Sequence, residues 1–65
     1  MRVEILDYGA GTETPQQRVF KGEPDQVRAQ LLVAYPWLRH RAYTDLQHEL
    51  QALGRVQNLF VEVET

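Results

Sequence analysis

The chain has 65 residues, of which 43% are apolar and 25% charged, a composition typical of a single soluble globular domain, 1–65, and not of a disordered chain. A net charge of −2 gives no general attraction to nucleic acid, and the absence of cysteine excludes disulfides and thiolate metal sites. No apolar run approaches the ~20 residues that span a bilayer. The chain opens on a strand-like pattern without a signal-peptide pattern, so we expect a cytoplasmic protein with no membrane partner.

A β-hairpin is predicted at the start of the chain. Residues 2–8 begin with alternating apolar and polar side chains, with Val3 and Ile5 on one face, which is typical of a strand with one buried side. Residues 9–15 are rich in glycine, threonine and proline and predict a long loop. Residues 17–21 contain β-branched and aromatic side chains and predict the second strand.

The longest periodic segment predicts a helix over residues 24–35. Its apolar residues Val27, Leu31 and Tyr35 recur every four positions, which places them on one helix face. Pro24 suits the first helical position, where its missing N–H costs nothing. The proline that follows residue 35 disfavours helical geometry before it and predicts the end of the helix.

A second helix is predicted over residues 45–53, with a stripe of leucines at positions 46, 50 and 53. Thr44 is a good N-cap, and Gln47 stands three residues later, which matches a capping box. Gly54 is placed to end this helix in the left-handed conformation.

The clearest strand is predicted over residues 58–64. Its side chains alternate, with Leu59, Val61 and Val63 on one face and Phe60 between two glutamates on the other. We expect the apolar face to turn toward the helices, which leaves Phe60 on the outer face of a sheet.

These elements predict an α+β fold: a two-layer sandwich in the order β-β-α-α-β, with a three-stranded sheet and two helices packed on one face. If the helices form an antiparallel hairpin, the last strand runs parallel to the first. Two strand orders are open, namely 2-1-3 with one parallel pair and an all-antiparallel 1-2-3. We favour 2-1-3 because the first and last strands are the most apolar. The expected core is Val3, Ile5, Val19 or Phe20, Val27, Leu31, Tyr35, Leu46, Leu50, Leu53, Leu59, Val61 and Val63.

The segment Asp7-Tyr8-Gly9-Ala10-Gly11 at the end of the first strand resembles the start of the glutaminase subunit of imidazole glycerol phosphate synthase. That family uses a nucleophilic cysteine in a much longer chain, and this sequence has neither. No helix follows the glycines to supply the N-terminus that a phosphate-binding loop needs. We therefore interpret the segment as a flexible turn.

Cations and aromatic side chains concentrate between the two predicted helices, at Trp37, Arg39, Arg41 and Tyr43, and Arg55 could join them. Such residues are enriched at binding hot spots, and the same pairing can stack on and neutralise single-stranded nucleic acid. The structural alternative, which we favour, is that the aromatic rings close the end of a small core while the arginines stay hydrated.

No catalytic or metal site is predicted, and no cofactor. The two histidines, His40 and His48, are eight residues apart, whereas metal ligands on a helix sit three or four apart. The glutamates at 4, 62 and 64 can share the outer sheet face, but an open sheet offers no water-poor cleft for acid–base chemistry. Serine and cysteine, the usual nucleophiles, are both absent.

We therefore predict a small non-catalytic protein-binding module, such as an adaptor, an inhibitor or a regulatory subunit, with Phe60 and the 37–43 connection as contacts. The alternative is a nucleic-acid-binding module that uses the arginines at 39, 41 and 55, although the overall acidity counts against it. The partner could also be a second copy of the chain. A homodimer would bury Phe60 together with Phe20 or Leu6 on the outer sheet face.

Overall fold

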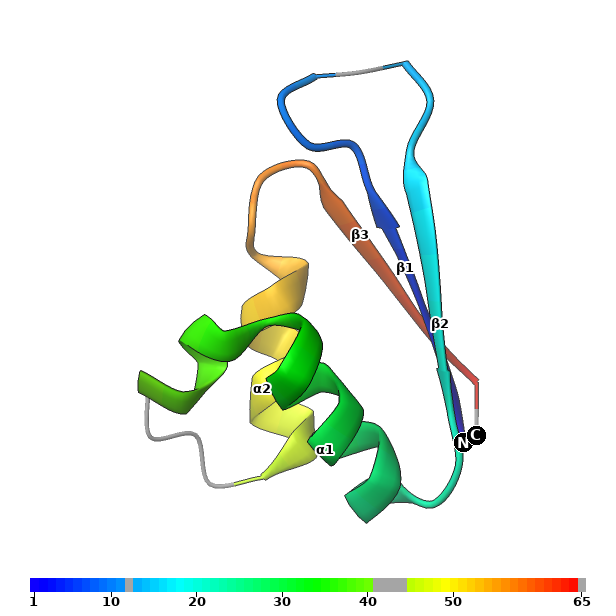
Figure 1. Cartoon of the computed structure of the whole chain (residues 1–65), viewed down its shortest axis with the longest axis vertical. Coiled ribbons are helices and arrows are strands. Elements are labelled where there is room, and N and C mark those ends of the chain that lie inside the picture. The colour runs from blue at the N-terminus through cyan, green and yellow to red at the C-terminus, as the bar shows by residue number, and fades with distance from the viewer. Residues whose placement is uncertain (12, 41–44, 65) are drawn as a thin grey trace.

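The computed structural model describes residues 1–11, 13–40 and 45–64. The elements follow in the order β1 (Arg2–Asp7), β2 (Gln16–Lys21), α1 (Pro24–Ala34), a 3-10 helix η1 (Pro36–His40), α2 (Leu46–Gly54) and β3 (Leu59–Glu64). The three strands form one sheet, and both helices lie on the same side of it (Figure 1). The predicted α+β fold in the order β-β-α-α-β is confirmed. No helix in the described ranges is long and apolar enough to cross a membrane.

The strand order is β2-β1-β3, as we predicted, but the direction of β3 is not. β3 runs antiparallel to β1, so the expected parallel pair is wrong. The prediction treated α1 and α2 as a hairpin, whereas both helices rise in the same direction in Figure 1, with η1 between them. α2 therefore ends beside the end of β1, where the Tyr8 N–H donates to the Asn58 carbonyl at 2.8 Å. From there the chain can only run back along β1.

The inner face of the sheet is set by β1. Val3 and Ile5 are fully buried beneath the helices. Phe20 of β2 lies opposite Val3 and is buried with it. Because strand residues alternate between faces, Val19 must point outward, and it is 39% exposed. Phe20, and not Val19, is thus the core residue of β2.

Helix α1 begins with a capping box, in which the Glu23 side chain and the Gln26 side chain each bond the other residue's backbone, and Pro24 occupies the first turn. The helix ends one residue earlier than predicted, with Tyr35 as its C-cap. Val27 and Leu31 are buried against the sheet, as the apolar stripe predicted.

Helix α2 begins at Leu46, and Asp45 is its N-cap, because its carboxylate accepts a 2.9 Å hydrogen bond from the His48 N–H. Our assignment of Thr44 as the N-cap is wrong, although residue 44 itself lies outside the described residues. The sequence has two good capping residues in succession, Thr44 and Asp45. Which of them becomes the N-cap depends on the path of the chain before the helix.

The end of α2 also differs from the prediction. Gly54 is the last helical residue and is not left-handed. The Arg55 N–H donates to the Ala52 carbonyl and the Val56 N–H donates to the Leu53 carbonyl, which closes the helix. The left-handed conformation falls instead on Asn58, with φ of 69°. Asparagine tolerates that region better than most residues, so the turn into β3 forms there.

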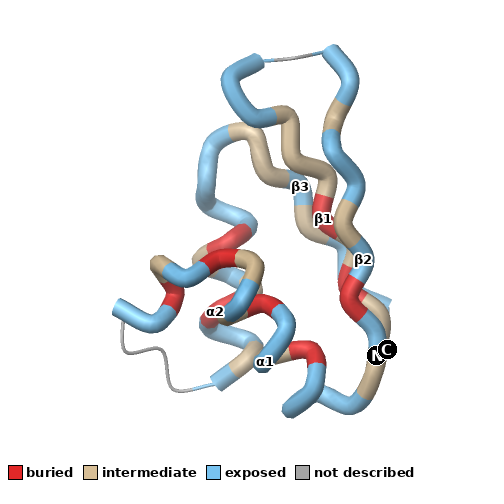
Figure 2. The backbone as a smooth tube through the Cα atoms, viewed as in Figure 1, coloured by how far each residue is buried: buried red, intermediate tan, exposed pale blue. Residues whose placement is uncertain are grey.

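The leucine stripe of α2 is only partly correct. Leu53 is fully buried, but Leu46 and Leu50 are half-buried, and Glu49 occupies the buried position between them. Val63 is 44% exposed and does not belong to the core. Figure 2 shows buried positions on both the strands and the helices. The buried apolar residues of the described chain form one cluster: Val3, Ile5, Phe20, Val27, Leu31, Tyr35, Leu38 and Leu53.

Leu31→Ala should lower the free energy of unfolding by ~2–5 kcal/mol, because it removes a fully buried side chain from a small core. Urea denaturation measures this change. Val33→Ala on the same helix is the control, since Val33 is 73% exposed and should change stability little. Equal effects of the two variants would mean that the buried face of α1 is misassigned.

Candidate interaction surfaces

The outer face of the sheet is the side turned away from the helices. Alternation from the buried residues of β1 assigns to it Arg2, Glu4 and Leu6 of β1, Gln17, Val19 and Lys21 of β2, and Phe60, Glu62 and Glu64 of β3. None of the described elements covers this face (Figure 1). We call it the outer sheet face.

Phe60 is the most prominent apolar residue of the outer sheet face, with 60% of its surface exposed. It pairs with Leu6 across β1, and the Tyr8 ring meets it edge to face, with centroids 5.4 Å apart and planes at 79°. Phe20 points into the core, so the expected contact between Phe60 and Phe20 is wrong, while the contact with Leu6 is confirmed. We call Leu6, Tyr8 and Phe60 the Phe60 patch.

Charges flank the Phe60 patch along the strands. The Arg2 guanidinium reaches Glu4 at 2.8 Å and Glu64 at 3.5 Å, so one arginine serves carboxylates from two strands. Glu62 lies opposite Glu4 in the register, and no ion pair is found for Glu62 within the described ranges. The patch is therefore bordered by a carboxylate that a cation could still neutralise.

The predicted patch between the helices is only partly described. On η1, Trp37 is half-buried against the core, Leu38 is buried, and Arg39 is exposed. Trp37 packs against the core, which is compatible with the structural alternative. The other two members, Arg41 and Tyr43, lie outside the described residues.

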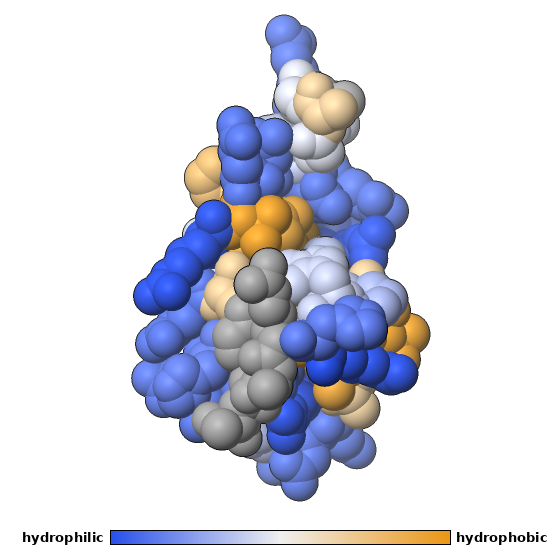
Figure 3. All heavy atoms as spheres, turned by 90° about the vertical axis from the view of Figure 1, so that its left-hand side faces the viewer, coloured by the Kyte–Doolittle hydropathy of each residue, from blue (hydrophilic) through white to orange (hydrophobic). Residues whose placement is uncertain are grey.

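The remaining predicted residues fall elsewhere. Arg55 is exposed on the separate connection between α2 and β3. Phe60 is on the opposite side of the sheet from Trp37, so the predicted site residues do not form one surface. Figure 3 shows that the helical side itself is mostly hydrophilic, with smaller apolar areas between polar side chains.

The glycine-rich segment after β1 is a structural turn. The Asp7 carboxylate accepts a 2.8 Å hydrogen bond from the Gly9 N–H, and Gly9 has a φ of 54°, which glycine adopts without strain. The Asn58 side chain donates to the Gly9 carbonyl at 2.9 Å. These bonds fasten the base of the loop to β3 and give the glycines a conformational role.

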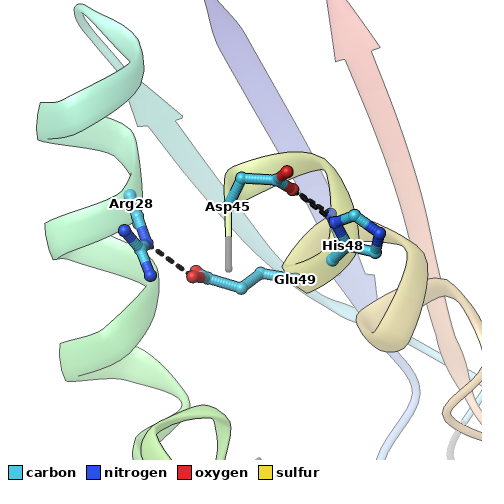
Figure 4. Close-up of polar contacts among 4 residues, drawn as sticks. All are labelled: Arg28, Asp45, His48 and Glu49. Atoms are coloured by element: carbon cyan, nitrogen blue, oxygen red, sulfur yellow. Dashed lines mark hydrogen bonds and ion pairs between the residues drawn. The ribbon is translucent and has the colours of Figure 1, made fainter. Parts of the chain in front are cut away.

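A buried ion pair between α1 and α2 was missed at the sequence level. The Arg28 Nε donates to Glu49 Oε1, and the two side chains point toward each other in Figure 4. Glu49 is only 1% exposed, and its second oxygen, Oε2, is buried without a hydrogen-bond partner. The available signal was its spacing: Leu46, Glu49 and Leu53 share one helix face at i, i+3 and i+7.

Asp45 and His48 form the other polar contact of Figure 4, with 2.7 Å between the Asp45 carboxylate and the His48 Nδ1. The backbone N–H of His48 and then its ring stabilise the charged carboxylate, so the pKa of Asp45 lies below its ordinary value of 3.8. No group of three or more potential metal ligands occurs among the residues that the structure describes.

Among the described residues, one hollow lies between α2 and β3 and another between α1 and β2, at opposite edges of the sheet. The larger, about 640 Å³, lies between α2 and β3; we call it the α2–β3 groove, and it is lined by Met1, Leu46, Gln47, Leu50, Gln51, Gly54, Val61 and Val63. The smaller, about 510 Å³, lies between α1 and β2 and is lined by Val19, Phe20, Ala29, Gln30, Val33 and Ala34.

Comparison with protein-family models, with curated proteins and with solved structures gave no significant match in any of the three. The chemistry of these surfaces is therefore the basis for any functional assignment.

The lowered pKa of Asp45 predicts a pH-dependent cap. A depressed carboxyl pKa stabilises the fold above the ordinary value of 3.8, and that stabilisation is lost as the pH falls through the lower folded-state pKa. Asp45→Ala should therefore lower the melting temperature at neutral pH, and its difference from wild type should shrink in acid. Asp45→Asn, which keeps an accepting oxygen, is the control. Its melting temperature should lie between those of the wild type and Asp45→Ala. A difference that is independent of pH would contradict a role for the charge.

Arg28→Met should destabilise the fold by up to about 3–5 kcal/mol, because it leaves the Glu49 carboxylate buried without its cation. Glu49→Met should cost less, since Arg28 is 39% exposed and can be hydrated. The double variant separates this effect from other contacts of Arg28. If Arg28→Met is unstable because the Glu49 carboxylate is buried without a cation, the double variant recovers most of the stability in urea denaturation. A double variant as unstable as Arg28→Met would contradict this explanation.

Proposed function

We propose that this chain is a small non-catalytic protein-binding module, of the kind that serves as an adaptor, an inhibitor or a regulatory subunit. The observation that supports the proposal most directly is the Phe60 patch. An aromatic ring with 60% of its surface exposed, held edge to face by Tyr8, stands on a sheet face that the described elements leave open. Aromatic residues presented in this way are enriched at the centres of protein interfaces.

The charges around the patch suggest the chemistry of the partner. Arg2 already pairs with Glu4 and Glu64, whereas Glu62 has no cation among the described residues. A matching surface would place an apolar side chain against Phe60 and a lysine or arginine near Glu62. Such a charge contributes to association rate and specificity more than to affinity.

The alternative, a nucleic-acid-binding module, remains a prediction based on arginines 39, 41 and 55 with Trp37 and Tyr43. Trp37 is half-buried in the core, which reduces the ring surface available to stack on a base. This observation favours protein binding over nucleic-acid binding for the described part of the connection.

Phe60→Ser tests the proposal in a pull-down from the native host followed by mass spectrometry. A partner that binds the wild type should be lost with Phe60→Ser and kept with Val33→Ser, since Val33 is also an exposed apolar residue but lies on α1. Glu62→Lys should weaken the same complex, and the effect should diminish at high salt. A partner retained equally by all variants would place the contact away from the outer sheet face.

Retention on heparin separates the two classes of function. A protein-binding module of net charge −2 should pass through at low salt. Retention that falls steeply as salt rises would instead support nucleic-acid binding.

A further inference from the structure

We infer that a second copy of this chain pairs with the open edge of β3 across a two-fold axis, and that the partner's α2 covers the α2–β3 groove. The resulting dimer has a continuous six-stranded antiparallel sheet with all four helices on one side. This contact uses the edge of β3 and the α2–β3 groove and leaves the Phe60 ring on the outer sheet face, so the inference goes beyond the proposed function. It differs from the outer-face homodimer that the sequence suggested, which would bury the Phe60 patch instead of the edge of β3.

The hydrogen-bonding pattern shows which backbone groups of β3 face the open edge. Tyr8 donates its N–H to the Asn58 carbonyl, so even-numbered residues of β1 bond to β3, while the Gly22 N–H bonds to the Met1 carbonyl on the other side. Bonded and non-bonded pairs alternate along an antiparallel ladder. The β3 residues whose backbone groups point away from β1 are therefore Leu59, Val61 and Val63.

The same three residues turn their side chains toward the helical side. Val61 is half-buried and Val63 is 44% exposed, although both belong to the apolar face of the strand. They form the floor of the α2–β3 groove, and half-buried Leu46 and Leu50 of α2 form its wall. No charged side chain lines this groove; its polar members are Gln47 and Gln51. An added strand would thus find both free backbone groups and an apolar pocket.

The sequence of β3 is complementary to itself in the register that is centred on Val61. With Val61 on the two-fold axis, Leu59 lies opposite Val63 of the partner subunit on the helical side, and Phe60 lies opposite Glu62 of the partner subunit on the outer face. Glutamate never faces glutamate. A register centred on Val63 would instead oppose Glu62 and Glu64, and like charges directly opposite are destabilising. Charge therefore favours the register centred on Val61.

This register provides four backbone hydrogen bonds. Val61 donates to and accepts from Val61 of the partner subunit, which gives two bonds. The Val63 N–H donates to the Leu59 carbonyl of the partner subunit, and the symmetric bond is the fourth. Leu59 adds none through its own N–H, because that group already donates to the Val56 carbonyl at 3.3 Å.

The opposite edge of the sheet is less suited to this pairing. On β2, the Lys21 carbonyl already accepts a 3.1 Å hydrogen bond from the Gln30 side chain, and lysine on an edge strand discourages further pairing. A β3-to-β2 contact would also be heterologous and would propagate into open chains. A closed two-fold dimer at β3 avoids that outcome and enlarges the core of a chain too short to bury much surface alone.

Sedimentation equilibrium tests the dimer with three variants. The wild type should be a monomer–dimer system, and Val63→Lys should raise its dissociation constant by about tenfold or more, because two lysines would enter the apolar interface. Val33→Lys, at an exposed position on α1, should leave the dimer unchanged. Phe60→Ser should weaken it less than Val63→Lys does, since the Phe60 side chain faces Glu62 of the partner subunit on the open outer sheet face and lies outside the apolar groove. Circular dichroism checks that each variant is folded.

Amide hydrogen exchange provides a second measurement on the unmodified chain. The Phe60 and Glu62 amides, which bond to β1, should be protected at every protein concentration. The Val61 and Val63 amides should exchange quickly when dilute and become protected as the concentration rises.

A wild-type monomer at high micromolar concentration would overturn the inference. So would open-ended polymers, or a dimer that Phe60→Ser dissociates and Val63→Lys does not. The pull-down detects a different protein and not the self-assembly of the chain, so the dimer and the proposed function can fail independently.

Discussion

The packing of two helices against one face of a three-stranded sheet is the constraint on which the rest of this structure depends. Val3 and Ile5 of the central strand form the sheet side of the core, and Val27, Leu31 and Leu53 form its helical side. Every other surface is defined by what this arrangement leaves uncovered. Within the described residues, no second layer covers the outer sheet face and no further strand pairs with β2 or β3.

The buried Glu49 places a charged group inside a small core. A carboxylate in a fully buried position is expensive unless a cation accompanies it, and Arg28 reaches it from the facing helix. An apolar residue of similar size would fill the position without that requirement. The pair does, however, fix how α1 lies against α2, because only one alignment of the helices places the guanidinium at Glu49. We interpret it as a determinant of helix orientation more than a source of stability.

The sequence predicted the features that depend on local pattern. The alternation of β1 and β3, the stripe of α1 and the order of the elements followed from periodicities that each segment carries alone. The direction of β3 did not, because it depends on where α2 begins, and the path that leads there through η1 has no periodic signal. The choice between Val19 and Phe20 could not be made either, since a strand of alternating character is compatible with both faces until its neighbour fixes the register.

The candidate surfaces differ in the same way: one follows from a local sequence pattern and the other from packing. Phe60 could be recognised in advance because its exposure follows from the alternation of one strand. The α2–β3 groove could not, since it arises from the overhang of Leu46 and Leu50 beyond β3, which only the packed structure defines. The leucine stripe was interpreted as core because leucine at helical spacing usually is. In a sheet of three strands, α2 presents more apolar surface than β3 can cover. That excess occurs beside β3, the edge at which we infer pairing with a second copy, so the incomplete core and the inferred dimer have the same origin.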